Sequence, residues 1–384
     1  MAQLFGVQVF LIGGVVRDII LQNPVKDIDI TVQGNAIEFA EFLKRKINCE
    51  IINIQEDLKT AKIQFKSGTV IDLASTREEK YLEPGALPVA YNFGCELVHD
   101  VKRRDFTINT LALRLTGGGK YNLVDYFEGF DDIKNKKIKI LHDNSFVDDP
   151  SRIIRALKFK VRLGFYIEQH TSDLMQEYLE NVNKSMPLSR IKSELNQYFS
   201  IDNDDIYSYL LKSNAYKLIC ENPLLEVNIK NLEDVKEFNL YNNEDIGFIY
   251  FSALVFNSDI NSERLALNNT EKKIINEVKK LMETQTDWDN PVGIYYALSG
   301  LQSLSLAIYY LISKNSAVIR YLKELKDIKV TITGDDLISV GINPSPLFAE
   351  ILDSILKEKI LGKLTTKEEE INFAKEYIKI KEGV

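Results

Sequence analysis

The chain contains Leu11-Ile12-Gly13-Gly14-Val15-Val16-Arg17-Asp18 and, nine residues after Asp18, Asp27-Ile28-Asp29-Ile30-Thr31-Val32. The second run is typical of a strand over residues 28–32, in which side chains two positions apart point to one face. We therefore expect Asp27 and Asp29 to present their carboxylates side by side. Such carboxylates repel each other unless a cation lies between them, and Mg²⁺ binds through one or two carboxylates plus substrate phosphates. The alternative is a polar edge strand without chemistry.

The glycine pair before Arg17 favours the first interpretation. Gly13 and Gly14 lack side chains, so backbone amides can approach a phosphate closely. Arg17 would add a charge-assisted hydrogen bond to the same phosphate. A nucleotide site that combines these residues with Asp27 and Asp29 is the hypothesis that this stretch supports.

A second polar cluster runs from Lys102 through Arg103, Arg104, Asp105, Thr107 and Asn109 to an apolar strand expected at 111–115. We expect this cluster at the mouth of a strand or helix rather than in a core. Asp105 or Thr107 would then cap a helix, a role that is compatible with phosphate binding. In the predicted strand 70–73, Asp72 is either a third carboxylate near the cation or an exposed polar residue.

A third cluster is Asp148-Asp149-Pro150-Ser151-Arg152, followed by Arg155 and Lys158. Arg152, Arg155 and Lys158 are three residues apart, which places three cations on roughly one helical face. We expect them to repel each other without an anion. Asp149 before Pro150 is also a favourable helix N-cap, with proline at the first helical position.

The 384 residues exceed what one hydrophobic core usually supports, so we expect two or three domains. Up to about residue 140 the pattern is α/β, and after Asp149-Pro150 it predicts helices alone. We interpret Gly117–Lys120 as a hairpin turn rather than a phosphate loop, because the full phosphate-loop spacing is missing. The predicted strands are 9–12, 28–32, 61–65, 70–73 and 111–115; the predicted helices are 36–46, 151–163, 172–179, 188–199, 206–211 and 366–381, with breaks at 222–223, 290–291 and 343–346.

The net charge of −8 argues against a nucleic-acid partner, but residues 100–165 carry +5 and the remainder −13. A local basic surface of this kind fits a phosphate-bearing ligand, although it is also typical of a solvated face. The 3 cysteines and 3 histidines lie too far apart for a disulfide framework or a zinc site. We see neither a membrane span nor a signal peptide and expect a cytoplasmic protein.

Together the three clusters resemble the motifs of class II nucleotidyltransferases, the family of bacterial tRNA CCA-adding enzymes, their A-adding and CC-adding relatives and bacterial poly(A) polymerases. The run 13–18 with Asp27 and Asp29 is similar to the first motif of that family, and 103–109 to the second. Residues 123–132 resemble the hinge motif, and 148–152 the nucleotide-selecting Glu-Asp-x-x-Arg. The resemblance covers about residues 5–200 and fades beyond them.

The resemblance implies an α+β protein with a polymerase-β-like head at 1–140, a helical neck with a nucleotide-selecting helix at 141–220, and a helical body and tail at 221–384. The tail and body would hold the acceptor stem of tRNA. Asp27 and Asp29 would bind Mg²⁺ and, with Asp72, form the catalytic set. The residues implied to bind the nucleotide are Gly13, Gly14, Arg17, Arg104, Asp105, Asn109, Asp149, Arg152, Arg155 and Lys158.

Base selection by Asp149 and Arg152 also follows from chemistry. Cytosine and adenine both present an amine donor beside a ring-nitrogen acceptor, so a carboxylate and a guanidinium fit them and refuse uracil and guanine. Two departures from the family are Asp148 in place of glutamate and Lys158 where arginine is common. The loop 81–88, Tyr-Leu-Glu-Pro-Gly-Ala-Leu-Pro, is similar to that of the A-adding branch.

The leading hypothesis is a tRNA 3′-end nucleotidyltransferase that adds the terminal A, or all of CCA, from ATP and CTP. The alternatives are a poly(A) polymerase and a non-catalytic RNA-binding protein on a transferase-like head. A phosphohydrolase is excluded, because no histidine precedes His99-Asp100 to complete a metal set. The sequence shows no sign of a protein partner.

Overall fold

The computed structural model describes residues 1–25, 27–116, 119–183, 188–227, 229–258, 263–342 and 344–382. The chain divides into two compact units. Unit 1 comprises Met1–Asp202, Tyr209–Glu221 and Arg264–Ala266; unit 2 comprises Asn203–Ser208, Asn222–Glu263 and Leu267–Val384. The head, neck and body boundaries inferred from the sequence stay a prediction.

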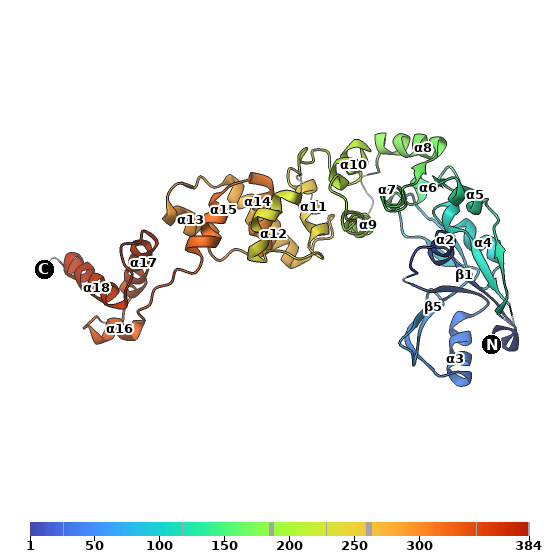
Figure 1. Cartoon of the computed structure of the whole chain (residues 1–384), viewed down its shortest axis with the longest axis horizontal. Helices are drawn as coiled ribbons and strands as arrows, with labels where there is room; N and C mark the ends of the chain where they lie inside the picture. The colour runs from blue at the N-terminus through green and yellow to red at the C-terminus, as the bar shows by residue number, and fades with distance from the viewer. Residues whose placement is uncertain are drawn as a thin grey trace. The chain divides into compact units, whose positions relative to one another are not determined.

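Unit 1 is built on a mixed sheet with the strand order β3-β4-β5-β2-β1-β8-β9 (Figure 1). The strand β1 lies antiparallel to both of its neighbours, whereas β2 and β5 are parallel. Two strands, β3 and β9, escaped the sequence analysis because each lies at an edge and its apolar residues remain exposed. The strands are β1 Gln8–Ile12, β2 Asp29–Gln33, β3 Cys49–Gln55, β4 Thr60–Phe65, β5 Val70–Ser75, β8 Ala112–Leu115 and β9 Tyr121–Val124.

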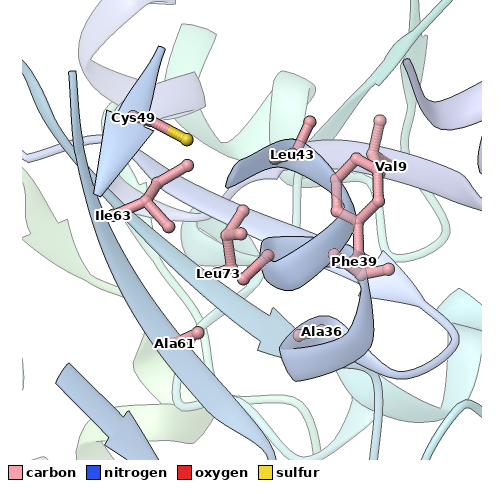
Figure 2. Packing of buried hydrophobic residues seen from close by; sticks show 10 residues of the cluster. Val9, Ala36, Phe39, Leu43, Cys49, Ala61, Ile63 and Leu73 are labelled. Atoms are coloured by element: carbon pink, nitrogen blue, oxygen red, sulfur yellow. The ribbon is translucent and has the colours of Figure 1, made fainter. Parts of the chain in front are cut away.

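The helix α3 (Ala36–Lys46) covers one face of this sheet. Phe39 and Leu43 of this helix point towards Val9, Ile63 and Leu73 of the strands (Figure 2). Asn35 caps the helix by accepting hydrogen bonds from the backbone N–H groups of residues 37 and 38. The amphipathic pattern of α3 therefore forms the core that holds the strands in place.

The opposite face of the sheet packs on helices that lead into the polar clusters. Because side chains alternate along β1, Phe10 and Ile12 point away from α3 and pack with Leu97 and Val101 of α4 (Leu97–Lys102). Figure 1 shows α2 (Gly14–Ile20) and α4 on the side of the sheet away from α3.

Strand register brings the first two clusters to the same edge of the sheet. Asp29 at the start of β2 pairs with Asp72 of the parallel strand β5. Ile12 at the end of β1 pairs with Ala112, and the N–H of Gly13 donates to the Leu111 carbonyl at 3.0 Å. The glycine pair, the carboxylates and the segment before β8 therefore converge.

The helices of unit 1 after Asp149 agree with the predicted ranges within about three residues, a normal uncertainty for helix ends. One expectation is wrong: the strand Tyr166–Ile167 (β11) pairs in parallel with Lys137–Ile138 (β10). This pair is too short to produce an alternating pattern. The remaining elements of unit 1 are α1 Ala2–Phe5, β6 Glu78–Lys80, β7 Val89–Tyr91, η1 Thr107–Asn109, α5 Gly129–Lys134, α6 Ser145–Asp148, α7 Ser151–Leu163, α8 Gln169–Glu180, α9 Ser189–Phe199, α10 Ile206–Lys212, which continues from unit 2, and η3 Ala215–Leu218.

The secondary-structure elements of unit 2 are all helices among its described residues. Asn268 and Thr333 each form a capping box at the start of a helix. Near the C-terminus a buried carboxylate, Glu370, accepts the N–H groups of Thr331 and Ile332, which ties the terminal helix to the segment before α16. The elements are η4 Ile229–Phe238, α11 Ile246–Val255, α12 Asn269–Glu283, α13 Pro291–Leu298, α14 Ser303–Ser313, α15 Ala317–Arg320, η5 Tyr321–Leu325, α16 Gly334–Ser339, α17 Leu347–Ile360 and α18 Lys367–Glu382.

Two predicted turns involve residues outside the described ranges. Gly117 and Gly118 of the expected hairpin are among them, although β8 and β9 on either side pair antiparallel. Asn343 of the predicted break at 343–346 is also outside. Asn290 caps α13, as the predicted break at 290–291 requires. In the described part of the chain, every helix is too short or too polar to cross a bilayer.

The residues after β9 hold the segment 105–109 in position. Asp125 accepts the N–H groups of Gly129 and Phe130, which starts α5. Thr107 donates its hydroxyl to Asp132 at 2.6 Å. Gly129 lies so close to this segment that an added Cβ would be 2.3 Å from the Thr107 carbonyl oxygen.

We expect Gly129→Ala to lower the free energy of unfolding by about 1–3 kcal/mol, because α5 must move away from Thr107 to make room. Urea denaturation measures the change. Gly334→Ala is the matched control, since its new Cβ would meet Phe348 at an ordinary 3.6 Å. Equal stability of the two variants would contradict this tight packing.

Candidate nucleotide-binding cleft

A polar cleft of about 470 Å³ lies in unit 1 where the three clusters meet. Gly13 and Asp72 are the predicted site residues that do not line it. The predicted residues that line it are Gly14, Arg17, Asp27, Asp29, Arg104, Asp105, Asn109, Asp149, Arg152, Arg155 and Lys158.

Asp27 and Asp29 are exposed residues that line the cleft, Asp29 at the start of β2 and Asp27 just before it. The cleft wall removes part of the water around the Asp29 carboxylate, which raises its pKa; the positive charge of Arg104 lowers it, and the neighbouring Asp72 and Asp27 raise it again. The carboxylate of Asp72 instead forms an ion pair with Lys62 at 3.2 Å. Within the described residues no three His, Cys, Asp or Glu side chains form a metal-binding group. Two crowded carboxylates that need further ligands fit a hard divalent cation whose coordination phosphates complete.

Gly13 makes room for Arg104. Its backbone has φ of 75°, a left-handed conformation that favours glycine, and an added Cβ would lie 2.8 Å from Nη1 of Arg104. Arg104 donates from Nη2 to Asp100 at 3.2 Å, while its buried Nε has no hydrogen-bond partner among the described residues. Gly14 begins α2 and lines the cleft directly. The glycine pair thus brings an arginine with spare donors next to the carboxylates.

Arg17 is more constrained than the sequence indicates. It is only 3% exposed and donates from Nε and Nη2 to Asp18 and from Nη1 to Asn109 at 2.6 Å. Its guanidinium also lies 5.0 Å from the centre of the Phe159 ring. Burial lowers the pKa of Arg17 and the adjacent Asp18 raises it. Most of its donors are therefore used within the protein.

Two cations of α7, Arg155 and Lys158, are neutralised by carboxylates of the protein. Arg155 donates from Nε to Asp105 at 2.8 Å and from Nη1 to Glu194 at 3.0 Å. Lys158 donates to Glu194 at 2.6 Å. Burial opposes the charge of Asp105, but Arg155 and the hydrogen bond from Asn109 outweigh it and lower the pKa of this carboxyl to about 2. The anions that these cations were expected to need are therefore carboxylates of the protein itself.

Two expectations for the second cluster need correction. Asp105, Thr107 and Asn109 lie just before β8, as expected, but all three are buried, because each finds a polar partner inside the unit. Neither Asp105 nor Thr107 caps an α-helix: Asp105 accepts the N–H of the next residue and side-chain donors. Residues 105–109 can be buried because their hydrogen-bond partners, such as Asp132 and Arg155, lie far away in the sequence.

The pair Asp149 and Arg152 is buried and held from several sides. Asp149 accepts the N–H of Ser151, as the predicted cap requires, and forms an ion pair with Arg190 at 2.7 Å. Arg152 donates to the Ser145 hydroxyl and to the Arg103 carbonyl. Its Nε, 3.7 Å from Asp149 Oδ2, has no hydrogen-bond partner among the described residues. This buried donor beside a carboxylate is thus left without a partner in the described part of the chain.

The loop after β6 contacts this pair. Arg152 donates to the Tyr81 hydroxyl at 3.4 Å, and the N–H of Gly85 donates to the Val147 carbonyl at 3.1 Å. Burial raises the pKa of the Tyr81 phenol. The loop 81–88 is therefore attached both to the third cluster and to α6.

The sequence analysis missed several residues of the cleft and its supports. Glu194 and Arg190 are one turn apart on α9 and reach Arg155 and Asp149. Glu79 accepts from Arg103 at 3.0 Å. Charge complementarity between the predicted helices 151–163 and 188–199 could have indicated the α9 pair, whereas nothing in the pattern around Glu79 marks it.

The sheet, its two covering layers and the carboxylates beside a glycine turn define a polymerase-β-like nucleotidyltransferase fold. Residues 9–139 match the family model of the poly A polymerase head domain. This match to the head domain, with the relatives and the solved structure described next, agrees with the resemblance to class II tRNA nucleotidyltransferases and poly(A) polymerases inferred from the motifs.

Among its relatives, the A-adding tRNA nucleotidyltransferase of Geobacter sulfurreducens is 32% identical over 95% of this chain and 44% of its own length. That of Halalkalibacterium halodurans is 28% identical over 100% of this chain and 91% of its own length. A solved complex of a CCA-adding enzyme with CTP has a TM-score of 0.76 at 29% identity, covering 96% of this chain and 91% of the other. The chain thus spans less than half of the Geobacter relative.

We expect Asp105→Asn to lower the free energy of unfolding at pH 7 by about 3 kcal/mol, because Arg155 loses a buried partner. Asp105 has a folded pKa of about 2, below its ordinary 3.8, so its contribution is complete above pH 3.8 and disappears as the pH falls towards 2. Urea denaturation across this range should show the two proteins converging. The exposed Asp57→Asn is the control; a difference independent of pH would refute the ion-pair explanation.

Proposed function

We propose that this chain is a template-independent nucleotidyltransferase that adds the terminal A to the 3′ end of tRNA. The observation that supports this most is the buried Arg152 Nε, free beside the Asp149 carboxylate in the same cleft as Asp27 and Asp29. One cleft thus combines groups for reading a base with groups for binding phosphates. The A-adding relatives favour tRNA as the acceptor.

In this proposal Asp27 and Asp29 hold Mg²⁺. Partial desolvation, and after it the charges of Asp72 and Asp27, raise the pKa of Asp29, and a bound cation would offset both. When bound, the cation promotes ionisation of the attacking hydroxyl and stabilises the leaving oxygen. The carboxylates orient that site, and Arg104 lies next to it with an unused Nε.

The reaction joins the 3′-hydroxyl oxygen of the tRNA to the α-phosphorus of the nucleotide while the bond to pyrophosphate breaks. The chain needs no covalent intermediate, so its contribution is positioning and charge stabilisation. Gly14 and Arg104 are placed to bind the phosphates. Asp105 and Asn109 are already paired with arginines, and we propose that they orient Arg155 and Arg17 at the cleft wall.

Base selection follows from Arg152 and Asp149. The free Nε of Arg152 donates to the ring nitrogen of adenine or cytosine, and the Asp149 carboxylate accepts from the exocyclic amine. With uracil or guanine, donors would face donors and acceptors would face acceptors. Each buried group left unpaired in this way costs about 1–3 kcal/mol. Because Arg190, Ser145 and the Arg103 carbonyl hold the pair, it cannot easily rearrange to accept the wrong base.

A preference for A over C requires something besides this pair. The loop 81–88 is stiffened by Pro84 and Pro88 and is attached to Arg152 through Tyr81. We propose that it presets the pocket for adenine. Complete CCA addition is the second candidate, because the CCA-adding enzyme solved with CTP aligns with 96% of this chain.

We further propose that the protein acts in the cytoplasm. Poly(A) polymerase activity is less well supported, since the acidic balance outside residues 100–165 disfavours capture of arbitrary RNA.

Asp27→Ala and Asp29→Ala should each reduce the transfer of labelled AMP to tRNA at least about a hundredfold, the scale on which losing one key electrostatic group slows catalysis. Their affinity for tRNA should stay near that of the wild type, because metal ligands serve the chemical step. Asp57→Ala, an exposed carboxylate in the turn after β3, is the control. Turnover within tenfold of wild type for both variants would exclude the metal assignment.

The choice between A-adding and CCA-adding activity is tested with two tRNA substrates. We expect a tRNA ending in CC to receive one A from ATP, and a tRNA lacking all three nucleotides to remain unextended with CTP alone. UTP and GTP should be rejected with both substrates. Efficient addition of two C residues would refute the A-adding proposal and leave CCA-adding or CC-adding activity instead.

A further inference from the structure

Arg162 lines the cleft but is not among the residues proposed to bind the metal or to read the base. It lies in the last turn of α7 and lines the same cleft as Gly14, Arg17 and Asp27. Its side chain is 45% exposed, and its nearest charged neighbour is Asp18, with 3.8 Å between Nη2 and Oδ2. That distance is too long for a hydrogen bond. Its guanidinium donors therefore remain available to a ligand.

Asp18 cannot neutralise Arg162 fully. Its carboxylate already accepts three hydrogen bonds from Arg17, at 2.9 to 3.1 Å. Arg17 in turn is fixed by Asn109 and Phe159 and is almost completely buried. At this part of the cleft the cation that can move to meet an anion is Arg162, not Arg17.

Other cations of the cleft are engaged with the protein. Arg155 and Lys158 bind Glu194, and Arg190 binds Asp149. Among the described arginines that line the cleft, Arg162 has the longest carboxylate contact, at 3.8 Å. Arg152, at 3.7 Å from Asp149, is 3% exposed and held by Ser145, whereas Arg104 contacts Asp100 at 3.2 Å. Arg104 lies against Gly13, and its positive charge lowers the pKa of Asp29. In the proposed function Arg104 therefore binds the phosphate next to the carboxylates that hold the metal.

We propose that Arg162 binds the terminal phosphates of the incoming nucleoside triphosphate and the pyrophosphate that leaves. An extended triphosphate carries charge along its length, so one arginine beside Asp29 leaves its far end without a counterion. Arg162 lies on the α2 side of the cleft, next to Arg17 and Asp18, and its planar fork can donate two parallel hydrogen bonds to a phosphate. This inference rests on the proposed nucleotidyl transfer and identifies a residue that its substrate contacts.

The alternative is that Arg162 only interacts with the C-terminal end of α7, where cations are favourable. The two explanations differ in their dependence on phosphate number. A contact with the terminal phosphates strengthens binding of ATP and inorganic pyrophosphate and leaves AMP unaffected. If Arg162 only stabilises the helix, its replacement should change the Kd values of ATP, AMP and pyrophosphate by the same factor.

The test is equilibrium binding of ATP, AMP and pyrophosphate, each with Mg²⁺, to the full chain and to Arg162→Gln. We expect the Kd for ATP and for pyrophosphate to rise between about tenfold and a hundredfold, the scale of one charge-assisted contact. The Kd for AMP should not change. Arg162→Lys keeps the charge without the fork and should give an intermediate loss.

Lys160→Gln is the matched control, because it removes one charge from the same turn of α7 at an exposed position outside the cleft lining. It should leave all three Kd values unchanged. An unchanged Kd for ATP in Arg162→Gln, or an equal loss for ATP and AMP, would overturn the inference. Binding is measured without transfer, so a wild-type protein that binds ATP through Arg162 but never extends tRNA would contradict the proposed function alone.

Discussion

The ion pair between Asp105 and Arg155 is the interaction on which the cleft depends. Asp105 belongs to the segment that leads into β8, and Arg155 to the middle of α7, 50 residues later. A buried carboxylate such as Asp105 stays charged only when an ion pair and hydrogen bonds compensate for its lost hydration. Asn109 donates to Asp105 and Glu194 accepts from Arg155, which fixes α7 and α9 against the sheet. The elements that carry the residues proposed to bind phosphate and to read the base are thereby placed in one unit.

Charge neutralisation divides the arginines of the cleft into two kinds. Arg17 and Arg155 are bound by carboxylates of the protein and act as parts of the wall. Arg104, Arg152 and Arg162 keep unused donors or lack a close carboxylate, and all three line the cleft. A cleft for a polyanion that consisted only of free arginines would be destabilised by their mutual repulsion. Pairing part of the set keeps the empty cleft stable while leaving donors where the phosphates and the base bind.

Much of the head could be predicted because its signals are local. The alternation in 28–32 and the 3.6-residue period in 36–46 and 151–163 produced elements close to those of the structure, and the cap at Asp149 followed from Asp-Pro alone. The edge strands β3 and β9 could not be found this way, since exposed edges carry weak patterns. For most of unit 2 the sequence predicted only that the chain is helical. An amphipathic period indicates a helix but does not specify which helices pack together.

The sequence by itself determined which chemical groups this protein has: two carboxylates two residues apart, a glycine pair before an arginine, and an aspartate and an arginine at a helix start. Their local geometry follows from strand and helix periods, which depend only on neighbours along the chain. Only the tertiary structure decided which cations stay available. Glu194 pairs with Arg155 and Asp18 with Arg17, whereas Arg162 has no close carboxylate among the described residues. Which arginines are paired depends on distances between elements that only the folded chain sets. Burial and pairing are properties of the packed chain, so charge patterns such as those of helices 151–163 and 188–199 could suggest a pairing but not decide it.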